Sequence, residues 1–348
     1  MAEARRLIWN EASDLGSEPT QAAHLRVTPR AIDVSILIVT WNSERWIDRC
    51  LRSLAAACEG LSYEVLIYDN ASADRTLDHI TVDDVQVLRS AENAGFAAGT
   101  NRAFRQSRGE YVFLLNPDCE LAPGALTKLA AFLESHPEIA AAAPLLENES
   151  GDSQREFQLR RLPTLGTLAS EILLLDKLFP ANGATAHYRA RDLDLTKPGP
   201  IEQPAAAALL IRRSVFEEVG PLDEQFSPAW FEDVDYCRRL AEAGKAVYYV
   251  PSAAAKHFGG ASLEHMPWGQ FIDVWYRNMW RYARKWLSRG EAEGLRWVIV
   301  GGMALRCLAA LAGFAHPEVG RRNAVKAYWH VLKRAWKRWS PDSSPSSS

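Results

Sequence analysis

The sequence has few cysteines, and their spacing follows no pattern. Five cysteines are spread over 348 residues, without a CxxC pair or a short regular interval. An odd and dispersed set argues against a disulfide framework and is typical of reduced thiols in a cytoplasmic chain. The opening residues, MAEARRLIWNEASD, include basic side chains but no apolar run. We therefore expect no signal peptide.

Several catalytic motifs are also absent. The sequence contains neither GxGxxG nor GxxxxGK[ST], the motifs of dinucleotide-binding and P-loop proteins. Membership of these two classes is therefore not expected. It also lacks HExxH and GxSxG, which argues against zinc proteases and serine hydrolases. The composition that remains, 47% hydrophobic and 24% charged, is that of a globular protein with a sizeable core.

The net charge of −3 hides an uneven distribution. Residues 277–338 contain fourteen Lys or Arg against three acids, so the rest of the chain is strongly acidic. Tryptophans accompany this basic segment, and its charges flank long apolar runs. The pattern favours contact with an anionic membrane surface. A nucleic-acid partner is not expected, because no known nucleic-acid module is present. A solvated helical face is the structural alternative.

Strand-like and helix-like segments alternate from Val34 onward. Helical spacing follows from Trp46, and further helices are expected over about 96–107 and from Pro123 to Ser135. The alternation predicts right-handed βαβ units and an α/β fold with a mostly parallel sheet flanked by helices. Buried apolar runs predict strands at 34–40, 63–69, 85–90, 111–115, 205–213 and 246–251.

The remaining segments set the expected domain organisation. An N-terminal arm covers residues 1–30 and a catalytic domain residues 31–265. Within that domain, residues 144–200 are less regular, and Pro and Gly punctuation around Pro180 to Pro200 predicts a long connection or a mobile loop over the site. Residues 266–339 are expected to be helical, and 340–348 to form a disordered tail.

One apolar stretch, Trp297 to Ala315, is nearly long enough to cross a bilayer. Gly301, Gly302 and Arg306 interrupt it. We therefore expect an amphipathic helix that lies at the membrane interface. The oligomeric state stays open, a homodimer included.

Polar residues gather where the predicted strands end. Thr40 and Asn42 follow the first strand, Asp69 ends the second, and Asn116 and Asp118 follow the fourth. Ligands of parallel sheets bind beyond the carboxyl ends of the strands, so a site is predicted at this edge. Polar loops without a binding role would show the same pattern.

A divalent cation fits the predicted site. Clustered carboxylates repel one another unless a cation binds. Oxygen ligands such as Asp118 with one imidazole, His257 in AKHFGG, suit Mg²⁺ or Mn²⁺ better than zinc. Such an ion would carry a diphosphate. A structural role for His257 is equally open.

The segment PAWFEDVDYCRRL contains three acids in five residues. Acids in a first helical turn also stabilise the helix dipole, but three exceed what capping needs. Asp233 or its neighbour Glu232 can act as a general base on an acceptor hydroxyl. Trp230 suits the apolar face of an acceptor sugar, with a core position as the alternative.

The segment NAGFAAGTN places small residues at a predicted loop-to-helix junction. It contains Asn93, Gly95, Phe96 and Asn101. Glycine there lets backbone N–H groups face a ligand, and a helix N-terminus favours anions.

Six segments in order resemble the motif series of family 2 glycosyltransferases, most of all the bacterial rhamnosyltransferase-like branch. They are VSILIVTWNS, IYDNAS, ENAGFAAGTN, LLNPDCELAPGAL, FEDVDYCRRL and KHFGGAS, and the resemblance covers about residues 33–285. The resemblance implies a GT-A fold and inverting transfer from a dTDP- or UDP-linked sugar, with rhamnose as the leading expectation. It also implies a cell-surface glycan or lipid-linked acceptor, and a cytoplasmic protein peripheral to the membrane.

The resemblance also assigns roles to residues. Asp118 matches the last acid of the family's metal-binding DXD motif, although Asn116 stands in the first position. Asp233 matches the catalytic base with Glu232 beside it, and His257 matches a histidine that completes the metal site. Gln203 to Ala206 departs from a Ser-Gly pair of many relatives, which leaves the acceptor open. The positions that match nucleotide contacts are Thr40, Asn42, Asp69, Asn93, Gly95, Phe96 and Asn101.

Two other functions remain open. A sugar-phosphate nucleotidyltransferase uses a similar sheet, but it would normally carry a Gly-rich basic loop after the first strand, which TWNSERW lacks. A non-catalytic, membrane-associated nucleotide-sugar-binding protein would keep the fold without the chemistry, and the retained acids argue against it.

Overall fold

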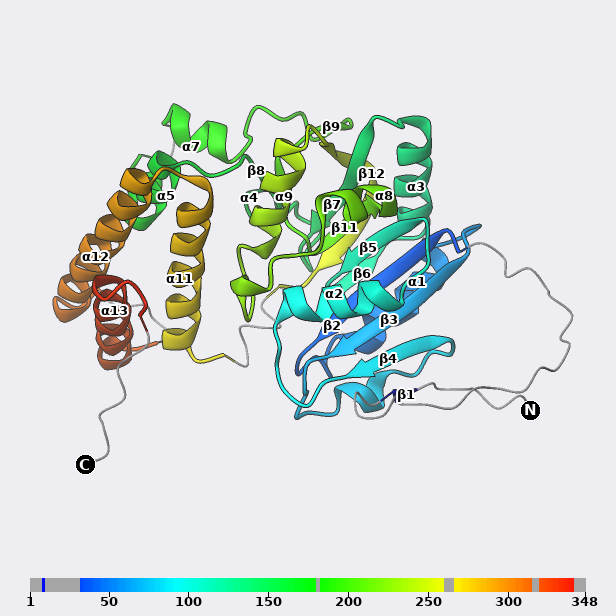
Figure 1. Cartoon of the computed structure of the whole chain (residues 1–348), viewed down its shortest axis with the longest axis horizontal. Helices are drawn as coiled ribbons and strands as arrows, with labels where there is room; N and C mark the ends of the chain where they lie inside the picture. The colour runs from blue at the N-terminus through cyan, green and yellow to red at the C-terminus, as the bar shows by residue number, and fades with distance from the viewer. Residues whose placement is uncertain (1–7, 10–31, 180–181, 260–265, 315–318, 341–348) are drawn as a thin grey trace, which may run out of the picture.

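The structure is a computed structural model that describes residues 8–9, 32–179, 182–259, 266–314 and 319–340. Figure 1 shows an α/β body built on a central sheet and, beside it, a group of long helices from the C-terminal part of the chain. The predicted tail lies almost entirely outside the described residues. Of the predicted N-terminal arm, the structure describes only β1 (Ile8–Trp9), which adds an edge strand parallel to β4.

The central sheet has ten strands within the described part of the chain, and nine of them follow the order β1-β4-β3-β2-β5-β11-β7-β12-β6, with β9 on β12. The strands from β1 to β5 in this order pair in parallel, as predicted. β11 runs antiparallel between β5 and β7. The strand bounds are β2 (Val34–Thr40), β3 (Tyr63–Asp69), β4 (Val85–Arg89), β5 (Tyr111–Leu115), β6 (Cys119–Leu121), β7 (Ile139–Glu147), β9 (Gly199–Pro200), β11 (Ala208–Arg212) and β12 (Ala246–His257).

Helices cover both faces of the sheet. α1 (Ile47–Ala57) and α3 (Ala125–Ser135) pack on one face, and α2 (Phe96–Gln106), α8 (Arg213–Val219) and α9 (Glu232–Glu242) pack on the other. Alternate residues of each central strand enter the two cores, because successive side chains in a strand point to opposite faces. This burial on both sides explains why β2 reads as a continuous apolar run.

The interpretation of 144–200 as a long irregular connection is wrong. β7 runs to Glu147, and short elements follow. They are too short to show a period in the sequence, and one of them depends on remote partners, since Leu168 and Ile172 pack among the C-terminal helices. The elements are α4 (Arg155–Gln158), β8 (Leu159–Arg160), α5 (Leu165–Ile172), α6 (Leu175–Leu178) and α7 (Gly183–Tyr188), and β8 pairs with β10 (Gln203–Pro204) in a second, two-stranded sheet.

Several element bounds also differ from the predictions. β12 continues six residues beyond Pro251, because a register shift between Val250 and Ala254 absorbs the proline. α3 begins at Ala125 and not at Pro123, since Gly124 adopts a left-handed backbone with φ of +68°. The three-residue β6 and the alanine-rich start of β7 were missed, because neither segment contains a run of large apolar residues.

The described part of the predicted C-terminal helical region contains three helices, α11 (Trp268–Trp286), α12 (Arg289–Leu311) and α13 (Arg321–Trp336). They form most of a third core, which Leu168 and Ile172 also enter and in which Leu295, Ile299 and Met303 of α12 are fully buried. By length and composition α12 could span a membrane, although its buried residues also fit a core helix. All five cysteines are free and buried, which agrees with the predicted thiols.

α5 and α12 meet at a close contact around Gly302. Arg306 donates a hydrogen bond to the carbonyl oxygen of Ile172, the last residue of α5. A Cβ atom on Gly302 would lie 2.5 Å from Cγ2 of Ile172, so only glycine allows this approach. This contact between Ile172 and α12 attaches the 159–188 region to the C-terminal helices.

We predict opposite effects of alanine at two neighbouring glycines. Gly302→Ala should lower the free energy of unfolding by about 1–3 kcal/mol, because the added methyl group overpacks the contact with Ile172. Gly301→Ala should raise it by about 0.5–1 kcal/mol, since nothing lies within 4 Å of its added Cβ and alanine favours the helix. Urea unfolding of both variants provides the test. Equal effects would mean that α5 does not pack on α12 as described.

Candidate active site

A cavity of about 270 Å³ lies beyond the carboxyl ends of β2 and β5. Its walls come from segments far apart in the chain: the ends of β2 and β12, the loop after β5, the first turn of α9 and the 157–188 region. A larger cavity of about 570 Å³, beside β9 and the outer side of α9, contains none of the predicted residues. The predicted residues that line the smaller cavity are Phe96, Asn116, Asp118, Trp230, Glu232, Asp233 and His257.

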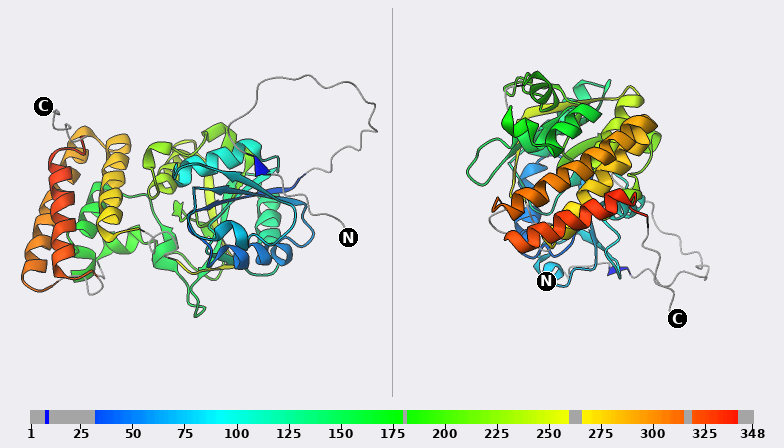
Figure 2. Two further views of the ribbon diagram at one scale, coloured as in Figure 1. Left: turned by 90° about the horizontal axis from the view of Figure 1, so that it is seen from below. Right: turned by 90° about the vertical axis from the view of Figure 1, so that its left-hand side faces the viewer.

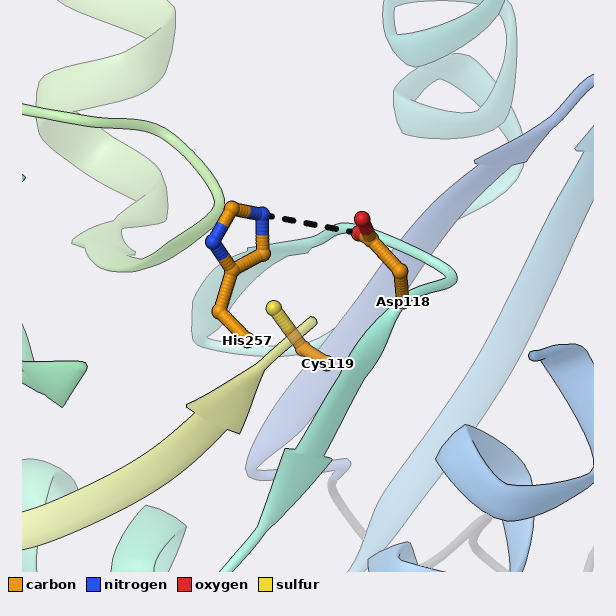
Figure 3. Close-up of side chains that lie close together, drawn as sticks. All are labelled: Asp118, Cys119 and His257. Atoms are coloured by element: carbon orange, nitrogen blue, oxygen red, sulfur yellow. Dashed lines mark ion pairs between the residues drawn. The ribbon is translucent and has the colours of Figure 1, made fainter. Parts of the chain in front are cut away.

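Asp118 and His257 face each other in this cavity. The His257 Nε2 atom lies 3.6 Å from a carboxylate oxygen of Asp118, and both side chains are buried (Figure 3). Cys119 contributes a third nearby atom. Its Sγ atom donates to the Ala207 carbonyl at 3.3 Å, and burial raises the pKa of the thiol far above its usual range, with the Asp118 charge adding to the effect. Cys119 therefore stays a neutral thiol beside the pair.

Gln154 determines which nitrogen of His257 carries the proton. Its amide nitrogen donates to the His257 carbonyl oxygen at 2.7 Å, which sets the amide orientation because a carbonyl only accepts. The Gln154 amide oxygen therefore accepts from Nδ1 of His257 at 2.8 Å. Burial lowers the pKa of His257, although the Asp118 charge opposes the shift. The lowered pKa favours the neutral ring. Nε2 then presents a lone pair toward Asp118.

This donor set fits a hard divalent cation. A carboxylate and a neutral imidazole are common ligands of a protein-bound metal. The second ring nitrogen of such an imidazole usually donates a hydrogen bond to a neighbour, which fixes the tautomer. Two protein ligands leave coordination positions for water and for ligand oxygens, which is typical of Mg²⁺ and Mn²⁺ sites. The residues present are therefore able to hold the predicted ion.

An unusual turn presents the acids of α9 to the cavity. Trp230 and Phe231, directly before the helix, both have left-handed backbones with φ of 71° and 75°. Such conformations cost about 1–3 kcal/mol each for residues other than glycine, so surrounding contacts must hold them. Asn278 of α11 is fully buried and donates its amide to the carbonyl oxygens of Ala229 and Trp230, at 2.9 and 3.1 Å. The C-terminal helices thus hold this turn.

Glu232 and Asp233 enter the cavity at the start of α9. Asp233 accepts hydrogen bonds from the backbone N–H groups of Val234 at 2.8 Å and Ala206 at 3.4 Å. Burial raises the pKa of the Asp233 carboxyl, although those bonds and Arg160 oppose the shift. Burial raises the pKa of Glu232 much further, and the Asp233 charge adds to the shift. Within the described part of the chain, the Oε2 atom of Glu232 has no hydrogen-bond partner. A carboxylate whose pKa lies above its usual range is a stronger base, as general-base catalysis requires.

Three of the residues predicted to contact the nucleotide, Thr40, Asn42 and Asp69, lie at the same edge of the sheet but do not line the cavity. Thr40 pairs with Asp69 across β2 and β3, and its hydroxyl donates to the Asp69 carboxylate at 3.0 Å. Asn42 has a left-handed backbone, and its side-chain oxygen accepts from the Ala73 N–H at 2.8 Å. Contact of these residues with a nucleotide stays a prediction.

The predicted loop before α2 packs against the segment that precedes α9. Asn93 accepts a hydrogen bond from the Gly95 N–H at 3.0 Å. A Cβ on Gly95 would lie 2.8 Å from the Pro228 carbonyl oxygen, and the Phe96 N–H donates to that oxygen.

Asn101 lies inside α2 and is buried. Its amide exchanges hydrogen bonds with the backbone of Leu222, at 2.9 Å each. The side chain therefore holds the loop that leads toward α9. A direct contact between Asn101 and a nucleotide stays a prediction.

Sequence reasoning missed one wall of the cavity. Arg160, Glu171 and Tyr188 line it, with Arg160 3.8 Å from Glu171 and 3.5 Å from the Tyr188 hydroxyl. Phe157 stacks on His257, with ring centroids 4.9 Å apart. No motif marks these residues. The run REFQLRRL, which mixes basic and apolar side chains, is the feature of the sequence that could have indicated a structured segment.

We predict that Gln154→Ala weakens Mn²⁺ binding by about 10–100-fold, because the variant no longer selects the His257 tautomer that faces Asp118. Isothermal titration with Mn²⁺ and a nucleoside diphosphate measures the affinity. Gln270→Ala, at an exposed glutamine, is the matched control and should bind as the unmodified chain does. Equal affinities of the two variants would remove Gln154 from the metal site.

Known proteins resemble this chain over most of its length. An L-rhamnosyltransferase of Mycobacterium tuberculosis, named for N-acetylglucosaminyl-diphospho-decaprenol, is 28% identical over 284 residues, covering 78% of this chain and 90% of the relative. Rhamnosyltransferase WbbL of Escherichia coli is 25% identical over 65% of this chain and 83% of its own. Staphylococcus aureus TarS, a solved structure, aligns over 89% of this chain and 93% of its own with 15% identity and a TM-score of 0.47.

The family model described as glycosyl transferase family 2 matches residues 35–220. That range contains β2, the loop after β5 with Asp118, and the Gln154 and Arg160 segments. The curated relatives above are named as transferases of sugars, so an enzyme is favoured over a binding protein. Together with the mostly parallel sheet and the helices on both of its faces, the family match and the two curated relatives confirm the resemblance found in the motifs: the chain is a glycosyltransferase and belongs to family 2.

Proposed function

We propose that this enzyme transfers a sugar, with inversion, from a nucleotide-diphosphate donor to an acceptor hydroxyl. One observation carries the proposal: a single cavity contains both the Asp118–His257 pair and the buried carboxylate of Asp233. The first can hold the charged leaving group, and the second can take a proton. Direct displacement needs these two functions within reach of one sugar.

The donor diphosphate lies on the Asp118 side of the cavity in this proposal. Asp118 and His257 hold Mg²⁺ or Mn²⁺, which when bound supplies positive charge to the departing diphosphate. Asn116, in the first DXD position, cannot contribute a charge, so Asp118 and His257 are the residues of this cavity that would hold the ion. The loop residues at the ends of β2 and β3, Thr40 and Asp69 among them, bind the nucleoside.

Asp233 removes the proton from the acceptor hydroxyl. As the acceptor oxygen forms its bond to the anomeric carbon, the bond between that carbon and the diphosphate oxygen breaks, and the electron pair leaves with the diphosphate. The proton passes to the Asp233 carboxylate. Attack from the face opposite the leaving group inverts the anomeric centre. The left-handed turn at Trp230 orients the base for this step.

The acceptor lies against the wall formed by Trp230, Trp275 and Arg160. Aromatic side chains suit the apolar face of a sugar. Arg160 has a buried Nε atom without a hydrogen-bond partner among the described residues, and its charge suits an anionic group of the acceptor. Because a relative is named for a lipid-diphosphate acceptor, we propose a lipid-linked glycan of the cell envelope as acceptor and rhamnose from a dTDP or UDP donor as the sugar. The enzyme then works on the cytoplasmic face of the membrane.

We predict that Asp233→Asn lowers sugar transfer by about 10²–10⁴-fold, the usual contribution of a general base. Its melting temperature should stay equal or rise, because burial makes the Asp233 charge unfavourable in the folded state. Release of nucleoside diphosphate from a panel of nucleotide sugars with Mn²⁺ measures the transfer.

Asp235→Asn is the matched control on the same helix. Asp235 points away from the cavity, toward Lys285 at 2.7 Å, Arg239 at 3.1 Å and the Trp286 indole N–H at 2.8 Å. This variant should lose stability while the folded fraction keeps its turnover. Normal turnover of Asp233→Asn would rule out Asp233 as the base.

A further inference from the structure

α12 carries an apolar face that no described residue covers. Its exposed positions follow helical spacing along one side, and the residues there are apolar: Trp297, Gly301, Leu305, Leu308, Ala309 and Ala312. Leu305 and Leu308 are 59% and 63% exposed, and Phe314 just beyond the helix is 81% exposed. A helix on the surface of a soluble protein normally turns charged or polar residues outward, so this face indicates an apolar surrounding.

A second group of exposed apolar residues lies beside it. Leu174, Leu178 and Phe179 are 43%, 68% and 64% exposed, and they follow the end of α5. The hydrogen bond from Arg306 to Ile172 places this end of α5 against the C-terminal half of α12. We use the term "apolar face" for Leu174, Leu178, Phe179, Leu305, Leu308 and Phe314.

The neighbouring helix α13 is basic and aromatic on its exposed side. Figure 2 shows α12 and α13 side by side at the end of the molecule away from the sheet. Exposed Arg and Lys residues, Arg322 and Lys326 among them, alternate there with Trp329 and Trp336, and Trp336 contacts Trp297 of α12 at 5.0 Å between ring centroids. The described residues between 297 and 340 include no Asp or Glu.

We propose that the apolar face, with the basic side of α13, docks on the surface of a bilayer that contains anionic lipid. Leucine and phenylalanine enter the boundary between headgroups and acyl chains, tryptophans lie at the headgroup level, and Arg and Lys contact lipid phosphates. Two other partners fit this surface less well. A second copy of the chain would bring two basic surfaces together, which repel each other, and a nucleic acid would leave the leucines exposed to water. A crossing orientation for α12 would require Leu295, Ile299 and Met303 to leave their core.

Docking in this way places the proposed acceptor side of the cavity next to the membrane. Glu171 lines the cavity and directly precedes Ile172, which packs on α12 beside the apolar face. A lipid-linked acceptor would then approach this wall of the cavity from the membrane side. This consequence rests on the proposed function, whereas the docking itself does not.

Flotation of the full chain with vesicles tests the proposal. We expect binding to vesicles of equal parts phosphatidylcholine and phosphatidylglycerol, little binding to phosphatidylcholine alone, and release at high salt. Leu305→Gln with Leu308→Gln should lower binding to the mixed vesicles by about tenfold or more, since the apolar insertion is lost. Ala55→Gln with Ala56→Gln, at exposed positions of α1, is the matched control and should bind normally.

Charge reversal supplies a second test. Arg322→Glu with Lys326→Glu should abolish the preference for anionic vesicles, whereas Lys128→Glu, on an exposed part of α3, should not. Normal flotation of the leucine double variant would overturn the proposal. A stable dimer of the unmodified chain that becomes monomeric in this variant would also overturn it. Transfer to a water-soluble acceptor, measured in the same variants, should stay unchanged. Loss of flotation with normal soluble transfer supports docking, and absence of transfer in every variant contradicts only the proposed function.

Discussion

The left-handed turn at Trp230 and Phe231 is the constraint on which the site depends. Two such residues in succession are unfavourable by about 1–3 kcal/mol each, and the turn persists because Asn278 and the aromatic rings of α11 surround it. The next two residues are Glu232 and Asp233. Without the turn, the first turn of α9 would point its acids away from Asp118 and His257, and the cavity would lose its base.

The C-terminal helices are therefore part of the active site. They hold the turn before α9 from one side, and through Gly302 and Ile172 they hold the wall that contains Arg160 and Glu171. The same helices carry the apolar face. One scaffold thus holds the turn that carries the base on one side and, in our proposal, presents the membrane-docking surface on the other.

The sequence predicted the sheet and the acids well, because local pattern determines them. β2 and β3 match the predicted runs residue for residue, since strands buried on both faces read as continuous apolar segments. Asp118, Asp233 and His257 follow motifs and line one cavity. The predicted Asp69 lies at the same sheet edge but outside the cavity lining, where it bonds to Thr40.

The missed residues act through tertiary contacts. Gln154 reaches His257 across 103 positions, and Asn278 reaches Trp230 across 48. Neither contact has a local signature, and the short elements of 144–200 show no period.

We propose above all that Asp233 is a buried base in the same cavity as the donor. The rate of single-turnover transfer, measured against pH at saturating donor and Mn²⁺, tests this most directly. The account predicts a rate that rises with pH through an apparent pKa above 3.8, the ordinary value for aspartate, because only the deprotonated carboxyl accepts the proton. A rate independent of pH from acid to neutral conditions would contradict it.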